Sequence, residues 1–308
     1  MRDIGPHAAP RHEGAGKVDG DVLRQRSSHS TGSSDVKIAR AVLRAAVSMS
    51  VTAALLVLPG NTSLLDRDAS RLPVVTTGSG PAHHAVVALG DSVPAGAACS
   101  CDPFPASYAA LLSRRTGTPV TVANEAISGL DTIGLLAQIK EERKVADAVR
   151  QADVVLVTIG ANDFGDHHDE VLEGSCTTGQ TDCVSDEMAT MRATLTKVLG
   201  EIRALRQGRS TSVLVTGYWN VFEDGEVAQR AAGAAGRQAS ITLTRNVNAA
   251  ISSASATAGT HYVDLFEAFQ NRGRDIDSLL APDGDHPDAA GHALIAQTLL
   301  DSGLPGDA

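Results

Sequence analysis

Short apolar runs alternate with longer amphipathic segments from about residue 84 onward. The runs are rich in β-branched residues and predict strands at 84–89, 120–124, 154–159, 212–216 and 261–263. Between them, apolar residues recur every three or four positions, as at Met188, Met191 and Leu195 in one expected helix, and a last helix is expected to follow Pro287 and to run through Leu300. The pattern predicts an α/β fold, a three-layer α/β/α sandwich with a mainly parallel five-stranded sheet, in one domain at 83–308.

The pattern before this domain is different. Residues 1–36 mix Gly, Ser, His, Arg and Asp without apolar periodicity, which predicts a disordered leader. In 37–60, basic residues precede an apolar run at 45–58, which predicts an export signal or a membrane anchor. As a helix the run would span about 21 Å, less than the roughly 30 Å of a bilayer core, so a cleaved signal is favoured over an anchor. Residues 61–82 are expected to be a linker, and the protein to be secreted or part of the cell envelope.

Composition narrows the classes of function. Hydrophobic residues make up 43% of the chain, enough for a packed core, whereas aromatic residues make up only 3%. Residues 1–60 carry eight Lys/Arg against five Asp/Glu, and the remainder carries 18 against 31, so the formal charges of the two parts are +3 and −13. An acidic domain repels a phosphate backbone, and we therefore expect no nucleic-acid partner.

The four cysteines form two close pairs along the sequence. Cys99 and Cys101 lie near each other, as do Cys176 and Cys183. An even count fits two disulfides in an exported protein, and three connectivities are open. We favour the two local pairs over free thiols or a zinc site, because paired C-x-x-C spacing is absent from the sequence.

Polar motifs follow the predicted strands, where a parallel α/β sheet binds its ligands. Each motif alone is more typical of a turn or a helix cap. Their order and their positions after strands favour a shared site. The motifs are Gly90-Asp91-Ser92, Ser128-Gly129, Gly160-Ala161-Asn162-Asp163 and, near the C-terminus, Asp283-Gly284-Asp285-His286-Pro287.

Together these motifs resemble the four sequence blocks of the SGNH hydrolases, also called GDSL esterases or lipases, and in particular an exported, actinobacterial-like type. The resemblance covers about residues 84–300, although Val93 stands where the family name has Leu. It implies a flavodoxin-like SGNH fold and an esterase with Ser92 as nucleophile and His286 as general base. It also implies an oxyanion hole made by the backbone N–H of Ser92 together with Gly129 and Asn162.

The chemistry of the residues agrees with these roles. A serine hydroxyl needs an imidazole to remove its proton, and that imidazole needs an acceptor on its other nitrogen. Asp283 could supply the acceptor within one turn, and the neighbouring Asp285 is the alternative. Tyr218 and Trp219 end the fourth predicted strand, where they could line an acyl or alcohol pocket or pack in the core. We expect no cofactor, since the G-x-G-x-x-G and phosphate-loop motifs are absent from the turn after the first strand.

A cluster of His and Asp follows the third predicted strand and raises a metal hypothesis. A solvated loop is the favoured interpretation of this cluster, which consists of Asp163, Asp166, His167, His168 and Asp169. The sequence therefore predicts a metal-independent serine esterase or lipase that hydrolyses carboxylic esters through an acyl-serine intermediate. Its expected partner is a small-molecule or lipid-derived acyl ester, with membrane association through the N-terminal apolar segment as a further option. The alternatives are an acyltransferase with the same site and a non-catalytic module that binds the cell envelope.

Overall fold

The computed structural model describes residues 83–176, 183–271, 273 and 275–303. The predicted leader, export signal and linker lie outside these residues. Within the described part of the chain, every helix is too short or too polar to cross a membrane.

Five parallel strands form one sheet in the order β2-β1-β3-β4-β5. The five predicted strands are confirmed, with β1 reaching Gly90 and β3 ending at Thr158. The sheet is wholly parallel rather than mainly so. Its strands are β1 (His84–Gly90), β2 (Val120–Asn124), β3 (Val154–Thr158), β4 (Ser212–Thr216) and β5 (His261–Val263).

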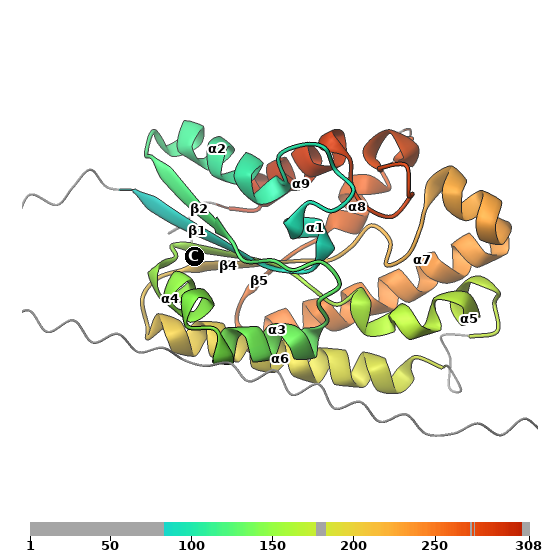
Figure 1. Cartoon of the computed structure of the whole chain (residues 1–308), viewed down its shortest axis with the longest axis horizontal. Coiled ribbons are helices and arrows are strands. Elements are labelled where there is room, and N and C mark those ends of the chain that lie inside the picture. Colours follow the sequence, from blue (N-terminus) through green and yellow to red (C-terminus); the bar gives the residue numbers. More distant parts are fainter. Residues whose placement is uncertain (1–82, 177–182, 272, 274, 304–308) are drawn as a thin grey trace, which may run out of the picture. The chain divides into compact units, whose positions relative to one another are not determined.

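Helices cover both faces of the sheet, as the alternating pattern predicts (Figure 1). The helix predicted through Met188, Met191 and Leu195 is α6. One face carries α2 (Phe104–Thr116), α8 (Leu265–Phe269) and α9 (Ala289–Asp301), and the other carries α3 (Thr132–Glu141), α4 (Arg143–Gln151), α6 (Ser185–Arg206) and α7 (Gly225–Ala258), which kinks at Gly233. The short elements are α1 (Ser92–Ala95), α5 (His168–Leu172) and the 3-10 helices η1 (Asn162–His167) and η2 (Ile276–Leu279).

The last helix follows Pro287, as expected, and begins at Ala289. The Asp288 side chain caps it by accepting hydrogen bonds from the N–H groups of Ala290 and Gly291. Pro287 pairs with Leu280 in an isolated antiparallel bridge, which ties the segment before the helix to the residue after η2.

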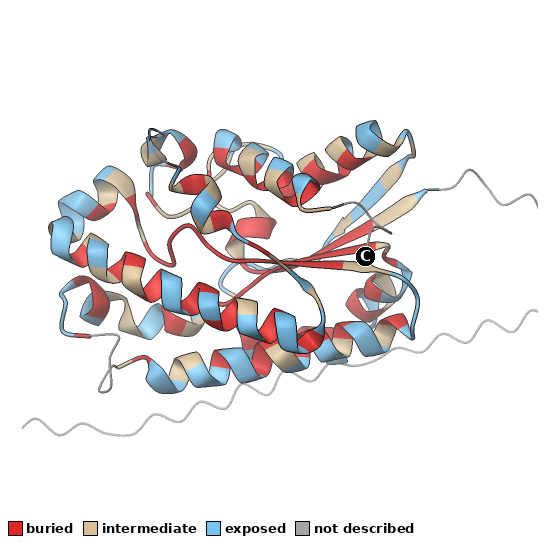
Figure 2. Cartoon of the chain, turned by 180° about the vertical axis from the view of Figure 1, so that it is seen from behind, coloured by how far each residue is buried: buried red, intermediate tan, exposed pale blue. Residues whose placement is uncertain are grey.

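The core lies between the central strands and the inner faces of the helices (Figure 2). All five residues of β3 are buried, as a central strand covered on both faces requires, whereas most of the edge strand β2 is only partly covered. The end of β1 packs especially tightly. Gly90 has a φ of +133°, and a Cβ placed there would lie 1.8 Å from the carbonyl oxygen of Thr158, so only glycine fits beside β3.

Both predicted cysteine pairs are disulfides in the structure. Cys99 is joined to Cys101 and Cys176 to Cys183, with Cα–Cα distances of 5.2 and 5.4 Å. The first bridge lies between α1 and α2, close after Ser92, and the second precedes α6. The local connectivity favoured by the sequence is therefore the one that the structure contains.

Candidate active site

Ser92 is the first residue of α1, immediately beyond the carboxyl end of β1. The preceding Asp91 caps this helix, since its carboxylate accepts the Val93 N–H at 3.0 Å. The same carboxylate accepts a hydrogen bond from the Tyr218 hydroxyl. Burial raises the pKa of Asp91 to about 7, against the opposing effect of these two hydrogen bonds. Asp91 and Tyr218 thus fix the turn that carries the serine.

His286 lies in a tight turn between η2 and α9. Asp283 accepts hydrogen bonds there from the backbone N–H groups of Asp285 and His286, both at 3.1 Å, and its other oxygen lies 2.8 Å from Nδ1 of the His286 ring. Partial burial opposes ionisation of Asp283, but these hydrogen bonds outweigh it and lower its pKa. Asp285 is the more distant carboxylate, 3.6 Å from the same Nδ1. The acceptor of the ring is therefore Asp283, and Nε2 is left free for other partners.

Ser92 and His286 line the same pocket, although they lie far apart in the sequence. The pocket has a volume of about 240 Å³, and no hydrogen bond between described residues joins the Ser92 hydroxyl to the His286 ring. Catalytic hydrogen bonds are often long in unliganded sites and tighten on substrate binding. Tyr218 and Trp219 line the pocket too, and both are almost fully buried. Trp219 stacks on Phe269 at a centroid distance of 4.4 Å, so it packs in the core as well as forming a wall of the pocket.

The residues expected in the oxyanion hole approach the pocket to different degrees. Asn162 begins η1 and lines the pocket, and its side-chain amide donates one hydrogen bond to the Leu130 carbonyl at 2.8 Å. Gly129 lies beside Leu130 in the loop after β2, with a φ of +81° that suits glycine, but it is not among the lining residues. The backbone N–H groups of Ser92 and Gly129 have no acceptor among the described residues. Asn162 therefore attaches the Gly129 loop to the edge of the pocket.

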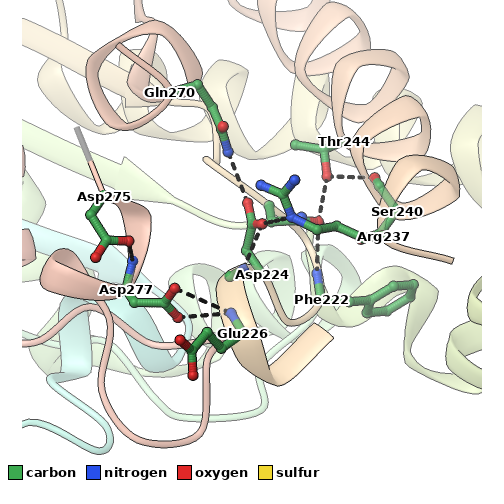
Figure 3. Close-up of polar contacts among 11 residues, drawn as sticks. Phe222, Asp224, Glu226, Arg237, Ser240, Thr244, Gln270, Asp275 and Asp277 are labelled. Atoms are coloured by element: carbon green, nitrogen blue, oxygen red, sulfur yellow. Dashed lines mark hydrogen bonds and ion pairs between the residues drawn. The ribbon is translucent and has the colours of Figure 1, made fainter. Parts of the chain in front are cut away.

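A network of polar contacts surrounds Asp224 at the start of α7 (Figure 3), and one backbone hydrogen bond ties it to the turn that carries His286. The backbone N–H of Asp224 donates to the Gly284 carbonyl at 2.8 Å. The Asp224 side chain is fully buried and accepts hydrogen bonds from Arg237 at 2.5 Å and from Gln270 at 2.8 Å. Asp277 in η2 accepts the Glu226 N–H at 2.9 Å, which adds a second link to the first turn of α7. None of these contacts was predicted, because they join residues far apart in the sequence.

His168 is a pocket residue that the sequence did not single out for this site. Its Nε2 lies 2.9 Å from Glu223, its Nδ1 lies 2.8 Å from Asp169, and its ring packs edge-on against Phe222. Partial burial disfavours the charged ring, but the two carboxylates outweigh burial and raise the pKa of His168. The only signal in the sequence was its position shortly after the Asn162 motif. His168 therefore places an imidazole with carboxylate partners beside the pocket.

The predicted His and Asp cluster does not form one centre. Asp163 bonds to Thr132, His167 to Glu170, and His168 to the carboxylates beside the pocket. Burial raises the pKa of Asp163 to about 6. Among the described residues, two groups of three have ligand atoms close enough to share a metal ion, one of them with His167 of this cluster, but each contains disulfide-bonded cysteine. These contacts favour a structural role for the cluster.

Comparison with solved structures shows which fold this is. A lipase from a goat rumen metagenome superposes with a TM-score of 0.55 at 18% identity, covering 72% of this chain and 99% of its own. An acetylxylan esterase from Geobacillus stearothermophilus superposes with a TM-score of 0.52 at 19% identity, covering 73% of this chain and 94% of its own. An extracellular lipase from Streptomyces rimosus superposes with a TM-score of 0.51 at 24% identity, covering 71% of this chain and 100% of its own. These likenesses show the fold.

Comparison of sequences gives the family. No curated protein is significantly similar to the chain. The profile of the GDSL-like lipase/acylhydrolase family, however, matches residues 88–294, which contain all four predicted motifs and nearly the whole described domain. The chain is a carboxylic ester hydrolase that belongs to the GDSL-like lipase/acylhydrolase family.

Proposed function

We propose that this enzyme hydrolyses acyl esters through an acyl-serine intermediate, with Ser92 as nucleophile, His286 as general base and Asp283 as the residue that orients the base. One observation carries the proposal. Ser92 and His286 line a single pocket, while the Nδ1 of His286 is held by Asp283. That contact favours the tautomer with the proton on Nδ1, so the free Nε2 can accept a proton from the serine.

The reaction would proceed in two halves. His286 takes the proton of the Ser92 hydroxyl as its oxygen attacks the ester carbonyl carbon, and then gives that proton to the alkoxide as the carbon–oxygen bond to the alcohol breaks. In the second half His286 takes a proton from water, whose oxygen attacks the acyl-serine, and returns it to Ser92. The products are the acid and the alcohol, and the enzyme is regenerated.

The negative oxygen of each tetrahedral intermediate needs hydrogen-bond donors. We propose that the Ser92 N–H, the Gly129 N–H and the Asn162 amide supply them. Two observations support this assignment: the two backbone groups have no other acceptor among the described residues, and Asn162 lines the pocket. Gly129 does not line the pocket itself, but the bond from Asn162 to the neighbouring Leu130 carbonyl holds the Gly129 loop at the pocket edge, which supports its place in the proposal.

The pocket favours a short acyl group. Its volume of about 240 Å³ is below the roughly 300–1,000 Å³ usual for sites that enclose drug-sized ligands. An acetylxylan esterase is among the similar structures, and an acetyl or similarly small acyl group suits a pocket of this size. We further propose that the enzyme acts outside the cytosol, since residues 37–58 have the pattern of an export signal and two disulfides persist best in an oxidising compartment.

A fluorophosphonate probe tests the nucleophile directly. The native protein should be labelled and should hydrolyse p-nitrophenyl acetate, whereas Ser92→Ala should lose both properties. Ser253→Ala, an exposed serine on α7, is the matched control and should keep both. Labelling of Ser92→Ala, or its retention of native turnover, would refute the assignment.

A further inference from the structure

A second cavity lies at the opposite end of the sheet from Ser92. Its volume is about 930 Å³, larger than that of the catalytic pocket. The last turn of α6, the starts of β4 and β5 and the residues after α9 form its walls. We call it the arginine cavity, because its lining includes Arg203, Arg206 and Arg209, with the polar side chains of Ser210, Thr211 and His261 around them.

In the described part of the chain, the three arginines form no ion pair with a carboxylate. Asp and Glu are absent from the lining, and among the described residues no carboxylate lies within 4.0 Å of any of these guanidinium groups. Nearby, Arg150 contacts Asp147 and Lys140 contacts Glu201. The arginine cavity therefore gathers three cations without an adjacent carboxylate among the described residues, in a chain whose net charge is −10.

Arg206 is the rigid part of this arrangement. Its side chain is buried, and its guanidinium donates to the carbonyls of Val149 at 3.2 Å and Arg150 at 2.5 Å and to the Thr211 hydroxyl. Carbonyl oxygens satisfy its hydrogen bonds but do not neutralise its charge. Buried charges are normally paired, so the positive charge of Arg206 favours an anion beside it. Burial and the like charge of Arg209 lower the pKa of Arg206, and they outweigh the opposite effect of Asp153, which lies beyond ion-pair distance.

Arg203 and Arg209 are the accessible part. Both are exposed, and each donates one hydrogen bond to a backbone carbonyl, Arg203 to Ala258 and Arg209 to Arg150. A guanidinium has five N–H donors in a planar fork, so most donors of each remain available. Forked donors of this kind match the arrangement of the oxygens of a phosphate group. A phosphate group also carries close to two negative charges, so it balances several cations better than a single carboxylate does.

We propose that the arginine cavity is a binding site for the phosphate group of an anionic ligand, separate from the catalytic pocket. The accessible guanidinium groups of Arg203 and Arg209 contact the phosphate oxygens, and Arg206 contributes fixed positive charge behind them. The same chemistry suits a soluble phosphate ester and a phospholipid headgroup. The site does not depend on the catalytic assignments, since none of its residues lies near Ser92.

Isothermal titration with pyrophosphate at low ionic strength tests the site. We expect millimolar or tighter binding to the native protein and at least a tenfold weaker affinity for the double variant Arg203→Ala/Arg209→Ala, which leaves Arg206 and its structural contacts in place. The matched control is Arg192→Ala/Lys197→Ala, which removes two exposed cations of the same helix outside the cavity and should leave the affinity unchanged. No binding to the native protein, or equal weakening in both double variants, would overturn the proposal.

Vesicles identify the source of the phosphate. Cosedimentation with vesicles of phosphatidylcholine plus phosphatidic acid, reversed by pyrophosphate and lost in Arg203→Ala/Arg209→Ala, would support a headgroup. Pyrophosphate binding without cosedimentation would support a soluble phosphate ester. Ser92→Ala should bind as the native protein does, and the arginine variants should keep native hydrolysis of p-nitrophenyl acetate, so failure of this proposal and failure of the catalytic one are distinguishable.

Discussion

Replacing Asp224 with alanine removes a fully buried carboxylate that accepts hydrogen bonds from Gly225, Arg237 and Gln270. Removing one partner of a buried ion pair typically costs about 3–5 kcal/mol. The side chain of Arg237 is 31% exposed and can turn toward water once it loses its partner, so we expect a loss near the lower limit, about 3 kcal/mol in the free energy of unfolding. With a urea dependence of about 2–3 kcal/mol per molar, the midpoint should fall by about 1 M or more.

The measurement is urea unfolding followed by circular dichroism, with Glu226→Ala as the matched control. Glu226 pairs with Arg230 in the same first turns of α7, but these side chains are 75% and 67% exposed. Such a surface pair contributes only about 0.3–0.5 kcal/mol. If Asp224→Ala destabilises the protein no more than Glu226→Ala does, the network does not hold this region together. At a urea concentration where both variants are folded, Asp224→Ala should also reduce turnover, because the Asp224 segment anchors the His286 turn.

Three further predictions concern the catalytic pocket. Asp283→Asn should lower kcat on p-nitrophenyl acetate by about 100-fold to 10,000-fold, because the ring of His286 loses the acceptor that orients it. Asp285→Asn, whose carboxylate is the more distant one, is the control, and equal losses in both would contradict the assignment. Asn162→Ala should lower kcat by about 100-fold to 1,000-fold with little change in KM, and a matching loss in substrate affinity would count against an oxyanion role. Asp91→Asn should change how stability depends on pH. The pKa of Asp91 is raised from its ordinary value near 3.8 to about 7, so the folded state holds this proton more tightly, and the stability that it contributes is lost as pH rises between about 4 and 7. Urea midpoints across this range should therefore decline less steeply in Asp91→Asn, and parallel curves would refute the buried-proton explanation.

The sheet, and the approach of Ser92 and His286 to one pocket, could be predicted from the sequence because their signals are local. A β-branched run such as 154–158 identifies a central strand by itself, and parallel strands bring the polar residues that follow them to one edge. The contact between Asp283 and the His286 ring was predictable for the same reason, because the two residues lie three positions apart, within one turn of the chain.

The support of the site was not predictable, because it depends on tertiary contacts. Asp224, Arg237 and Gln270 come from three separate segments, and nothing near Asp224 in the sequence marks it as a buried ion-pair partner. His168 is similar: its neighbours in the sequence suggested a solvated loop, while its contact with Glu223 depends on how α5 packs against the segment after β4. The arginines at the other end of the sheet come from the end of α6 and the turn that follows it, and that they gather in one cavity whose described lining holds no Asp or Glu could be recognised only in three dimensions.

The order of the elements along the chain has a consequence for biosynthesis. The sheet is complete once β5 ends at Val263, whereas His286 follows only after α8 and η2. A ribosome-bound chain that has released all five strands would therefore carry Ser92 without the residue proposed as its base. If the proposed roles hold, the appearance of esterase activity during translation should report the release of the His286 turn rather than the closure of the sheet.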